Sequence, residues 1–166
     1  NVADETGSRA LKKGIRLTQE HLEELRAIGR THVEVAVLEE GNVHEDEAAR
    51  VLAEALRTGE MHASRPTGGR VNLRAVVDGL LEVDAGRLLA LNTIPGIALA
   101  TRRHRTVVGP NQDTDNLATL KIIPYAVGRA DLDRALALAS ARPGILELRP
   151  FRPQRAALLL VGDEMV

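Results

Sequence analysis

Apolar residues at helical spacing follow a capping residue near the start of the chain. The hydroxyl of Thr18 can accept a hydrogen bond from a free amide of a first helical turn, and Leu22 and Leu25 then recur three residues apart. Gly29 supplies the left-handed residue that commonly ends a helix. The pattern therefore predicts a helix over residues 19–28.

Three further helices are predicted on similar grounds. Asn42 and Glu45 form a pair that resembles a capping box, and the alanine-rich helix that follows reaches Gly59. Its small inward side chains should allow close approach to a neighbouring element. The other two helices are expected over residues 85–92, after the cap Asp84, and from Asp131 to Leu138.

Alternation of apolar and polar residues, and short apolar runs, predict the strands. Residues 32–38 alternate polar and β-branched side chains, which is typical of a strand with one solvated face. Residues 117–127 form the longest strand-like run, and Pro124 within it indicates a bulge or a sheet edge. Lys121 in the same run indicates an edge strand or an outward face. Shorter strands are expected over residues 97–101, 106–108 and 145–149.

A hairpin is predicted around Asp78 and Gly79. Apolar runs over residues 71–77 and 80–83 flank this pair. Asp-Gly favours a type I′ turn, because both central residues of that turn need a positive φ. Residues 60–70, which precede the hairpin, are expected to form a loop.

Together these elements predict an α+β fold. The short strands between residues 97 and 127 suit a β-rich barrel or barrel-sandwich-like core, with about four helices packed against it. A chain of 166 residues can bury such a core without a disulfide or a metal. Residues 1–9 are expected to be frayed or disordered, and residues 10–155 to form the main domain.

Composition narrows the classes of function. The 22 basic and 23 acidic residues nearly balance, and Tyr125 and Phe151 are the only aromatic side chains. Binding of nucleic acid is not expected, since it would need a basic surface with aromatic side chains for base stacking. No apolar run is long enough for a membrane span. The lack of cysteine excludes disulfides and thiolate chemistry, and fits a cytoplasmic protein.

The loop from Arg65 to Arg70 is the strongest candidate for a binding site. Gly68 and Gly69 let backbone amides converge, and the two arginines together with the Thr67 hydroxyl could hold a phosphate or a carboxylate. The spacing matches neither a P-loop nor a dinucleotide-binding motif. A glycine-rich turn with solvated arginines explains the same residues, so both interpretations stay open.

Other polar clusters indicate turns and solvated surface. The five histidines are scattered and form no pair at metal-ligand spacing, so no metal site is expected. Residues 111–116 offer oxygen ligands but lack the remaining positions of a calcium loop, which favours an Asx-rich turn. Residues 102–105 form a short basic loop. No serine has the neighbours of a catalytic nucleophile, and no catalytic residue is assigned.

The end of the chain resembles the beginning of another domain. Residues 156–161 form an apolar run that predicts a buried strand. Prolines within residues 149–153 predict a stiff connector before that strand. Because no helix follows, we expect residues 156–166 to be the first strand of a truncated domain of a longer polypeptide. The turn after the strand contains Gly162, Asp163 and Glu164.

Several stretches, taken in order, resemble one protein family. They are Leu11 to Thr18, Val33 to Gly41, Glu45 to Ala49, Thr67 to Asn72 and Ala118 to Ala126. Their order is similar to the N-terminal region of bacterial molybdopterin-binding proteins of molybdenum-cofactor biosynthesis, over about residues 10–160. The run from Leu158 to Val166 is similar to the first strand and turn of the cofactor-binding domain in gephyrin-type molybdopterin proteins, although Val161 stands where those proteins have threonine.

The resemblance implies an accessory N-terminal domain, residues 10–155, without a complete catalytic site of its own. Such a domain would position substrate or mediate assembly, with no nucleic-acid or membrane partner. Molybdopterin would bind to the downstream domain of the same chain, in a parent protein that could be a molybdopterin-processing transferase, and no cofactor is expected within residues 1–166. The alternatives are a stand-alone anion-binding domain that uses Arg65 to Arg70, and a homo-oligomer formed through a sheet edge or the alanine-rich helix.

Overall fold

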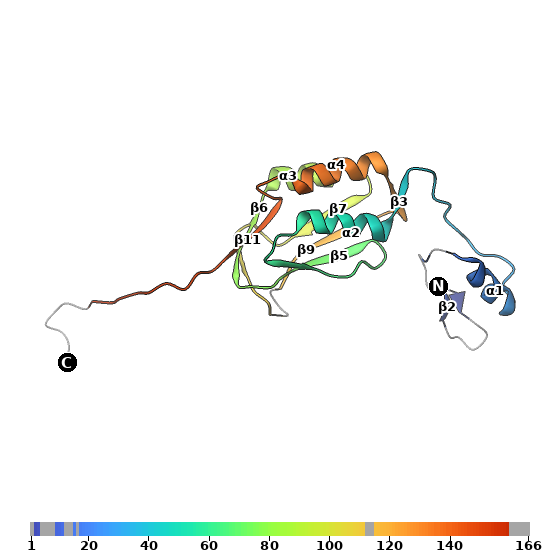
Figure 1. The fold of residues 1–166 in the computed structure, drawn as a ribbon, viewed down its shortest axis with the longest axis horizontal. Helices are drawn as coiled ribbons and strands as arrows, with labels where there is room; N and C mark the ends of the chain where they lie inside the picture. Colours follow the sequence, from blue (N-terminus) through green and yellow to red (C-terminus); the bar gives the residue numbers. More distant parts are fainter. Residues whose placement is uncertain (1, 4–8, 12–14, 16, 112–114, 160–166) are drawn as a thin grey trace.

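Three helices cover one face of a four-stranded antiparallel sheet (Figure 1). The computed structural model describes residues 2–3, 9–11, 15, 17–111 and 115–159. The sheet has the order β4-β5-β9-β7 and consists of Met61–Ala63 (β4), Arg70–Ala75 (β5), Asn116–Ile122 (β9) and Ile97–Thr101 (β7). The helices are Glu45–Leu56 (α2), Ala85–Asn92 (α3) and Arg129–Ser140 (α4).

Two smaller antiparallel sheets lie beside the large one. The first joins Leu146–Pro150 (β11), Gly79–Val83 (β6) and Thr106–Val108 (β8), and the second joins Asn42–His44 (β3) and Ala126–Gly128 (β10). In the second sheet Val43 lies opposite Val127, and each strand leads directly into a helix. These helices, α2 and α4, pack against each other, so the small sheet fixes where both begin. Residues 42–150 are called the body below.

The N-terminal elements lie beyond the β3 end of the body (Figure 1). They are Val2–Ala3 (β1), Arg9–Leu11 (β2) and Gln19–Ala27 (α1). The first two pair antiparallel, so Val2, Ala3 and Arg9 of the segment predicted to be frayed lie in strands, and α1 contacts β2. The predicted helix over residues 19–28 is confirmed: Thr18 accepts a hydrogen bond from the His21 amide, and Gly29 has a φ of 73°.

The α+β class is confirmed, but the predicted barrel is wrong for the described residues. Closing a sheet into a barrel requires its two edge strands to pair. Here β4 and β7 remain the two edges of the large sheet. The strands β6 and β8, which come after β5 and β7 in the sequence, form a separate sheet with β11 instead. The sheets therefore stay open.

The helix α2 begins later than its sequence pattern predicts. Asn42 lies in β3 opposite Gly128, and His44 caps the helix by accepting the Asp46 amide on Nδ1 at 3.2 Å. The capping-box assignment of Asn42 and Glu45 is therefore wrong, because strand pairing takes the backbone of residues 42–44. The alanine-rich inner face is confirmed, and its buried alanines are Ala48, Ala49 and Ala53.

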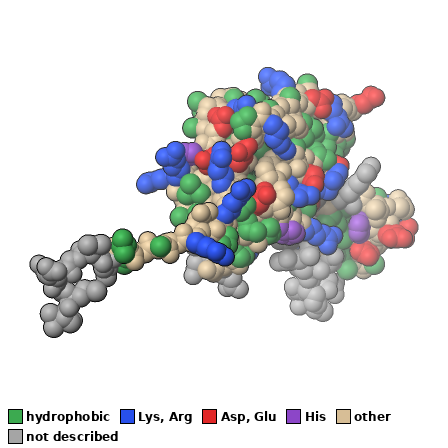
Figure 2. All heavy atoms as spheres, turned by 60° about the vertical axis from the view of Figure 1, so that its left-hand side comes forward, with side chains coloured by type: hydrophobic (Ala, Val, Ile, Leu, Met, Phe, Trp, Pro, Cys, Tyr) green, Lys and Arg blue, Asp and Glu red, His purple; other side chains and the backbone are tan. Residues whose placement is uncertain are grey.

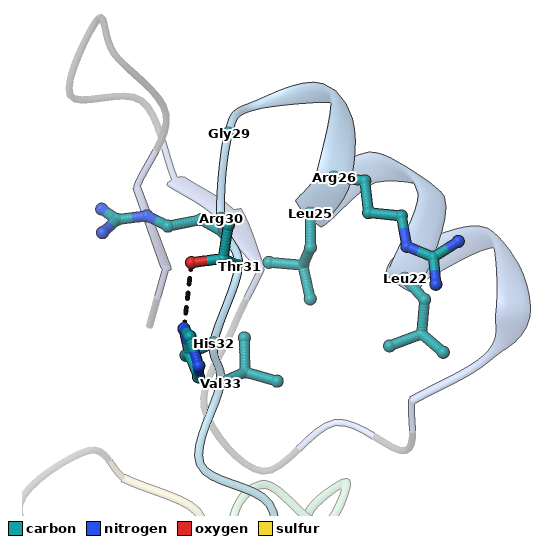
Figure 3. A pocket seen from close by; sticks show the side chains of 8 residues that line it. All are labelled: Leu22, Leu25, Arg26, Gly29, Arg30, Thr31, His32 and Val33. Carbon is teal, nitrogen blue, oxygen red and sulfur yellow. Dashed lines mark hydrogen bonds between the residues drawn. The ribbon is translucent and has the colours of Figure 1, made fainter.

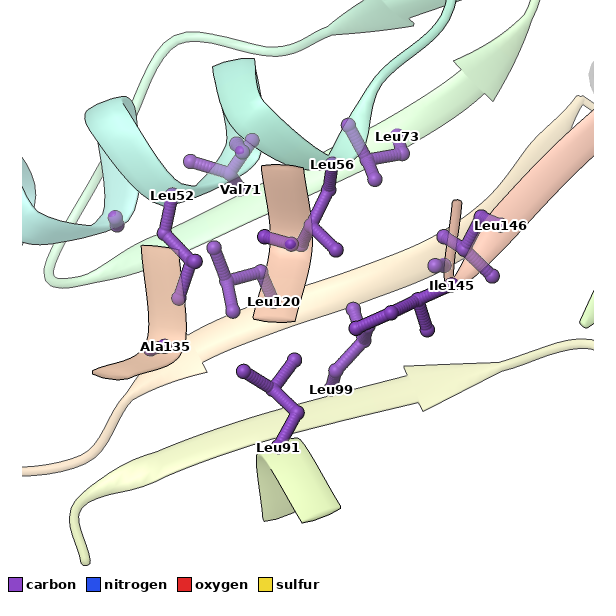
Figure 4. Close-up of a cluster of buried hydrophobic side chains, with 14 of the residues drawn as sticks. Leu52, Leu56, Val71, Leu73, Leu91, Leu99, Leu120, Ala135, Ile145 and Leu146 are labelled. Carbon is purple, nitrogen blue, oxygen red and sulfur yellow. The ribbon is translucent and has the colours of Figure 1, made fainter. Parts of the chain in front are cut away.

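The hydrophobic core lies between the helices and the inner face of the large sheet (Figure 4). The buried side chains that meet there include Leu52 and Leu56 of α2, Val71 and Leu73 of β5, and Leu120 of β9. Full burial of one such side chain contributes roughly 1.5–3 kcal/mol. The stability of the body therefore depends mainly on this layer.

The segment over residues 32–38 forms no strand, contrary to the prediction. Val35 and Val37 are 57% and 85% exposed, and no strand among the described residues pairs with this segment. Alternating side chains produce a strand only where a neighbouring strand takes up the backbone hydrogen bonds. In this structure the segment is an exposed connector between α1 and β3.

The long run over residues 117–127 is divided at Pro124, as predicted. The strand β9 ends before this proline and β10 begins after it. Within the break, the Tyr125 carbonyl accepts the Glu45 amide at 2.9 Å. The interruption therefore joins the end of the large sheet to the first residue of α2.

Asp78 and Gly79 do not form the predicted hairpin turn. The strands β5 and β6 belong to different sheets, and neither residue of the pair has a positive φ. Gly79 instead lies in β6 between Val108 and Pro150 of the two neighbouring strands. A Cβ atom at this glycine would lie 2.4 Å from the Arg149 carbonyl oxygen. Close approach of two strands, rather than a turn, explains the glycine.

Replacement of Gly79 by alanine is expected to destabilise the protein by about 1–3 kcal/mol, because the added Cβ must push β11 away from β6. Gly59→Ala is the matched control, since a Cβ there has no atom within 4 Å, and its effect should stay within about 0.5 kcal/mol. Urea unfolding followed by circular dichroism measures both values. An equally small effect of the two substitutions would contradict the close packing of these strands.

The C-terminal segment extends away from the body (Figure 1), and its residues 151–159 form neither a helix nor a strand. Leu158 and Leu159 are each 85% exposed. The strand predicted over residues 156–166 is therefore not formed at residues 156–159. The remainder of that segment lies outside the described residues and includes Gly162, Asp163 and Glu164.

Candidate functional site

Residues 64–69 connect β4 to β5 and contain most of the candidate binding loop from Arg65 to Arg70. The strand β4 was not expected, because it lies within residues 60–70, which were predicted to be a loop. Thr67 and Arg70 exchange backbone hydrogen bonds of 3.1 and 3.2 Å, which closes a tight turn around Gly68 and Gly69. Both glycines have a positive φ, 55° and 70°, which a residue with a side chain rarely adopts. The turn lies against the first residues of α2 and the last residues of β9.

A carboxylate of the chain itself binds the Gly69 amide. Gly69 N donates to Asp46 Oδ1 at 2.7 Å, and the Gly69 carbonyl accepts the Ile122 amide at 2.8 Å. A Cβ atom at position 69 would lie 2.6 Å from the Ile122 carbonyl oxygen and 2.7 Å from Glu45 Oε2. Only glycine therefore fits this position, and the turn is fixed to both α2 and β9.

The Lys121 ammonium group ties the same three segments together. Its Nζ lies 2.6 Å from the Gly68 carbonyl oxygen, 2.6 Å from the Ile122 carbonyl oxygen and 3.4 Å from Glu45 Oε2. An ammonium group has three donors, so these acceptors account for all of them. The edge-strand interpretation of Lys121 is wrong, because β9 lies inside the sheet, although the side chain is partly exposed at 39%.

Glu45 is the one charged side chain that is buried among the described residues, at 5% exposure. A buried carboxylate is unfavourable without a charged partner or hydrogen bonds. The Lys121 ammonium group, 3.4 Å from Glu45 Oε2, is such a partner. The resulting cluster is called the Gly69 latch and consists of Glu45, Asp46, Gly68, Gly69, Lys121 and Ile122.

The latch occupies one of the two glycine amides of the predicted anion-binding loop, that of Gly69. Arg65, Thr67 and Arg70 are exposed. An anion site built on both glycine amides would need the Gly69 amide, which already binds a carboxylate held on a helix. A phosphate would therefore have to displace Asp46 before it could use this amide.

Other polar side chains singled out in the sequence have local structural partners. His104, within the basic loop over residues 102–105, accepts the Val83 amide on Nδ1 at 3.0 Å. Asp115 pairs with Arg74 at 2.7 Å just before β9, while residues 112–114 of the same polar turn lie outside the described residues. Within the part of the chain that the structure describes, no group of three or more His, Asp or Glu residues could hold a metal ion.

Charged side chains of both signs are interspersed on the face of the molecule seen in Figure 2. On α2, Arg50 donates to Glu47 at 2.7 Å, and this hydrogen bond lowers the pKa of the Glu47 carboxyl and raises the pKa of Arg50. Exposed pairs of this kind contribute little to stability. No helix among the described residues is long and apolar enough to cross a bilayer.

A separate pocket of about 440 Å³ lies beside α1 (Figure 3). At the end of this helix the Gly29 amide donates to the Arg26 carbonyl at 3.0 Å, and the Arg30 amide donates to the Leu25 carbonyl at 2.9 Å. This pair of bonds is a Schellman motif, which turns the chain back beside the helix. The pocket lies between α1 and the returning chain and is open to solvent. Its lining residues are Leu22, Leu25, Arg26, Gly29, Arg30, Thr31, His32 and Val33.

Comparison of the chain with protein-family models, with curated proteins and with solved structures finds no match.

Proposed function

We propose that the chain is an accessory domain of a molybdopterin-binding protein in molybdenum-cofactor biosynthesis. It would act in the cytoplasm and position substrate or mediate assembly. Molybdopterin would bind to a downstream domain of the same polypeptide rather than to the body. The family in this proposal comes from the ordered motifs of the sequence, and the role comes from where those motifs lie in the fold.

The main support for this proposal is that three of the stretches that resemble the family meet at the Gly69 latch. The first supplies Glu45 and Asp46, the second supplies Gly69, and the third supplies Lys121. Their polar groups bind one another across sequence separations of 23 and 76 residues. Residues that satisfy one another in this way hold a fold together, which supports a scaffold role for the motifs rather than a pterin site.

An experiment in the host cell tests this function. The codons for residues 42–150 are replaced by a flexible glycine–serine linker in the native gene, and the activity of a molybdenum-dependent enzyme is measured together with the cellular molybdopterin content. We expect the enzyme activity to fall severalfold while molybdopterin is still made, because the body assists a step without binding the pterin. Unchanged enzyme activity would contradict an accessory role in this pathway.

A further inference from the structure

The pocket beside α1 combines an apolar floor with a cationic rim (Figure 3). Leu25 is buried at 3% exposure, while Leu22 and Val33 are 36% and 37% exposed and remain accessible from the pocket. Arg26 and Arg30 extend on opposite sides of this apolar group. The pocket therefore offers contacts for an apolar body and for a negative charge at its edge.

Among the described residues that line the pocket, none has an acidic side chain. Successive residues turn by about 100° around a helix axis, so Glu20, Glu23 and Glu24 of α1 fall away from the face that carries Leu22 and Leu25. The carbonyl end of a helix disfavours an anion. At this helix end, however, the Schellman bonds already occupy two of the last carbonyl oxygens.

Polar groups complete one wall of the pocket. Thr31 Oγ1 lies 2.9 Å from His32 Nδ1, and this hydrogen bond orients the imidazole ring (Figure 3). Small-molecule sites are commonly about 300–1,000 Å³ in volume and mainly apolar, with a few polar groups that fix the orientation of the ligand. The volume of about 440 Å³ lies within this range, and Leu22, Leu25 and Val33 form the apolar part of a pocket that is open to solvent.

We propose that this pocket binds a small organic anion with an apolar body, of the class of aryl or short-chain acyl carboxylates and sulfonates. The apolar body lies against Leu22, Leu25 and Val33. The anionic group meets a guanidinium group of the rim, Arg26 above all. This pocket shares no residue with the Gly69 latch. Its test therefore does not depend on the proposed function.

Two fluorescent dyes test the proposal on the full chain. Anilinonaphthalene sulfonate carries an anion on an aromatic body, and phenylnaphthylamine is its uncharged counterpart. We expect the sulfonate dye to bind about tenfold more tightly than the neutral dye. Arg26→Gln should weaken binding of the sulfonate dye about tenfold and leave the neutral dye unaffected, whereas Leu22→Asp should weaken binding of both.

Matched variants elsewhere separate this pocket from general dye binding. Leu89→Asp changes a leucine that is 66% exposed on α3, and Arg103→Gln removes an exposed charge from the basic loop. Both should leave dye binding unchanged. Arg26 is exposed, so its variant decides the question even if Leu22→Asp unfolds α1. The proposal is overturned if the wild-type chain binds neither dye, if Leu89→Asp loses as much binding as Leu22→Asp, or if Arg26→Gln has no effect.

Discussion

Replacement of Gly69 by alanine is expected to destabilise the protein by about 2–5 kcal/mol. Alanine at the observed φ of 70° is strained, and its Cβ would lie 2.6 Å from the Ile122 carbonyl oxygen. The turn would have to move away from β9, and the bond from the Gly69 amide to Asp46 would break. Urea unfolding followed by circular dichroism measures the loss.

Gly68→Ala separates the cost of the left-handed backbone from the cost of the close contact. Gly68 also has a positive φ, 55°, but a Cβ there has no atom within 4 Å. This variant should therefore lose only the cost of the left-handed backbone, about 1–2 kcal/mol. Equal losses at positions 68 and 69 would contradict the close contact between the turn, Glu45 and Ile122.

Leu120→Ala is expected to cost about 2–5 kcal/mol, because it removes a fully buried side chain from the middle of the core. Leu120 lies on β9 between Val71 of β5 and Leu99 of β7, under the helices (Figure 4). The neighbouring side chains come from several elements and cannot all close the cavity. The same unfolding measurement gives the loss.

Leu89→Ala is the control for this core substitution. Leu89 lies on α3 and is 66% exposed, so its truncation should change the stability by no more than about 0.5 kcal/mol. A loss below about 1 kcal/mol for Leu120→Ala would show that the sheet and the helices do not pack as the structure has them.

The helices could be predicted from the sequence because their signals are local. Thr18 and Asp84 cap α1 and α3 as expected, and each accepts an amide only three residues ahead. Periodic apolar residues then decide which face turns inward. The start of α2 was missed, since the residues before it pair with a strand more than eighty residues away in the chain.

Strand pairing was predicted less well, because it joins distant parts of the chain. The segment over residues 32–38 has the alternation of a strand but no partner strand among the described residues. Asp78 and Gly79 have the local signature of a hairpin, yet the chain passes there from one sheet to another. The same uncertainty about partners led to the prediction of a barrel where the sheets are open.

In the candidate site, too, single residues could be predicted from the sequence but their distant partners could not. The sequence indicates the glycine pair and the lysine within an apolar strand as two separate unusual features. Their partners on α2 could not be predicted, because the hydrogen bonds from Gly69 to Asp46 and from Lys121 to Glu45 cross 23 and 76 residues. Gly162, Asp163 and Glu164 lie outside the described residues, so their assignment to a molybdopterin-binding domain stays a prediction.

The most direct test of the Gly69 latch is an NMR measurement of the Gly69 amide during titration with phosphate. The latch predicts slow hydrogen exchange, a chemical shift that does not respond to phosphate, and faster exchange in Asp46→Ala. An amide that exchanges rapidly and shifts when phosphate is added would contradict the latch. That result would favour an anion-binding loop at Arg65 to Arg70.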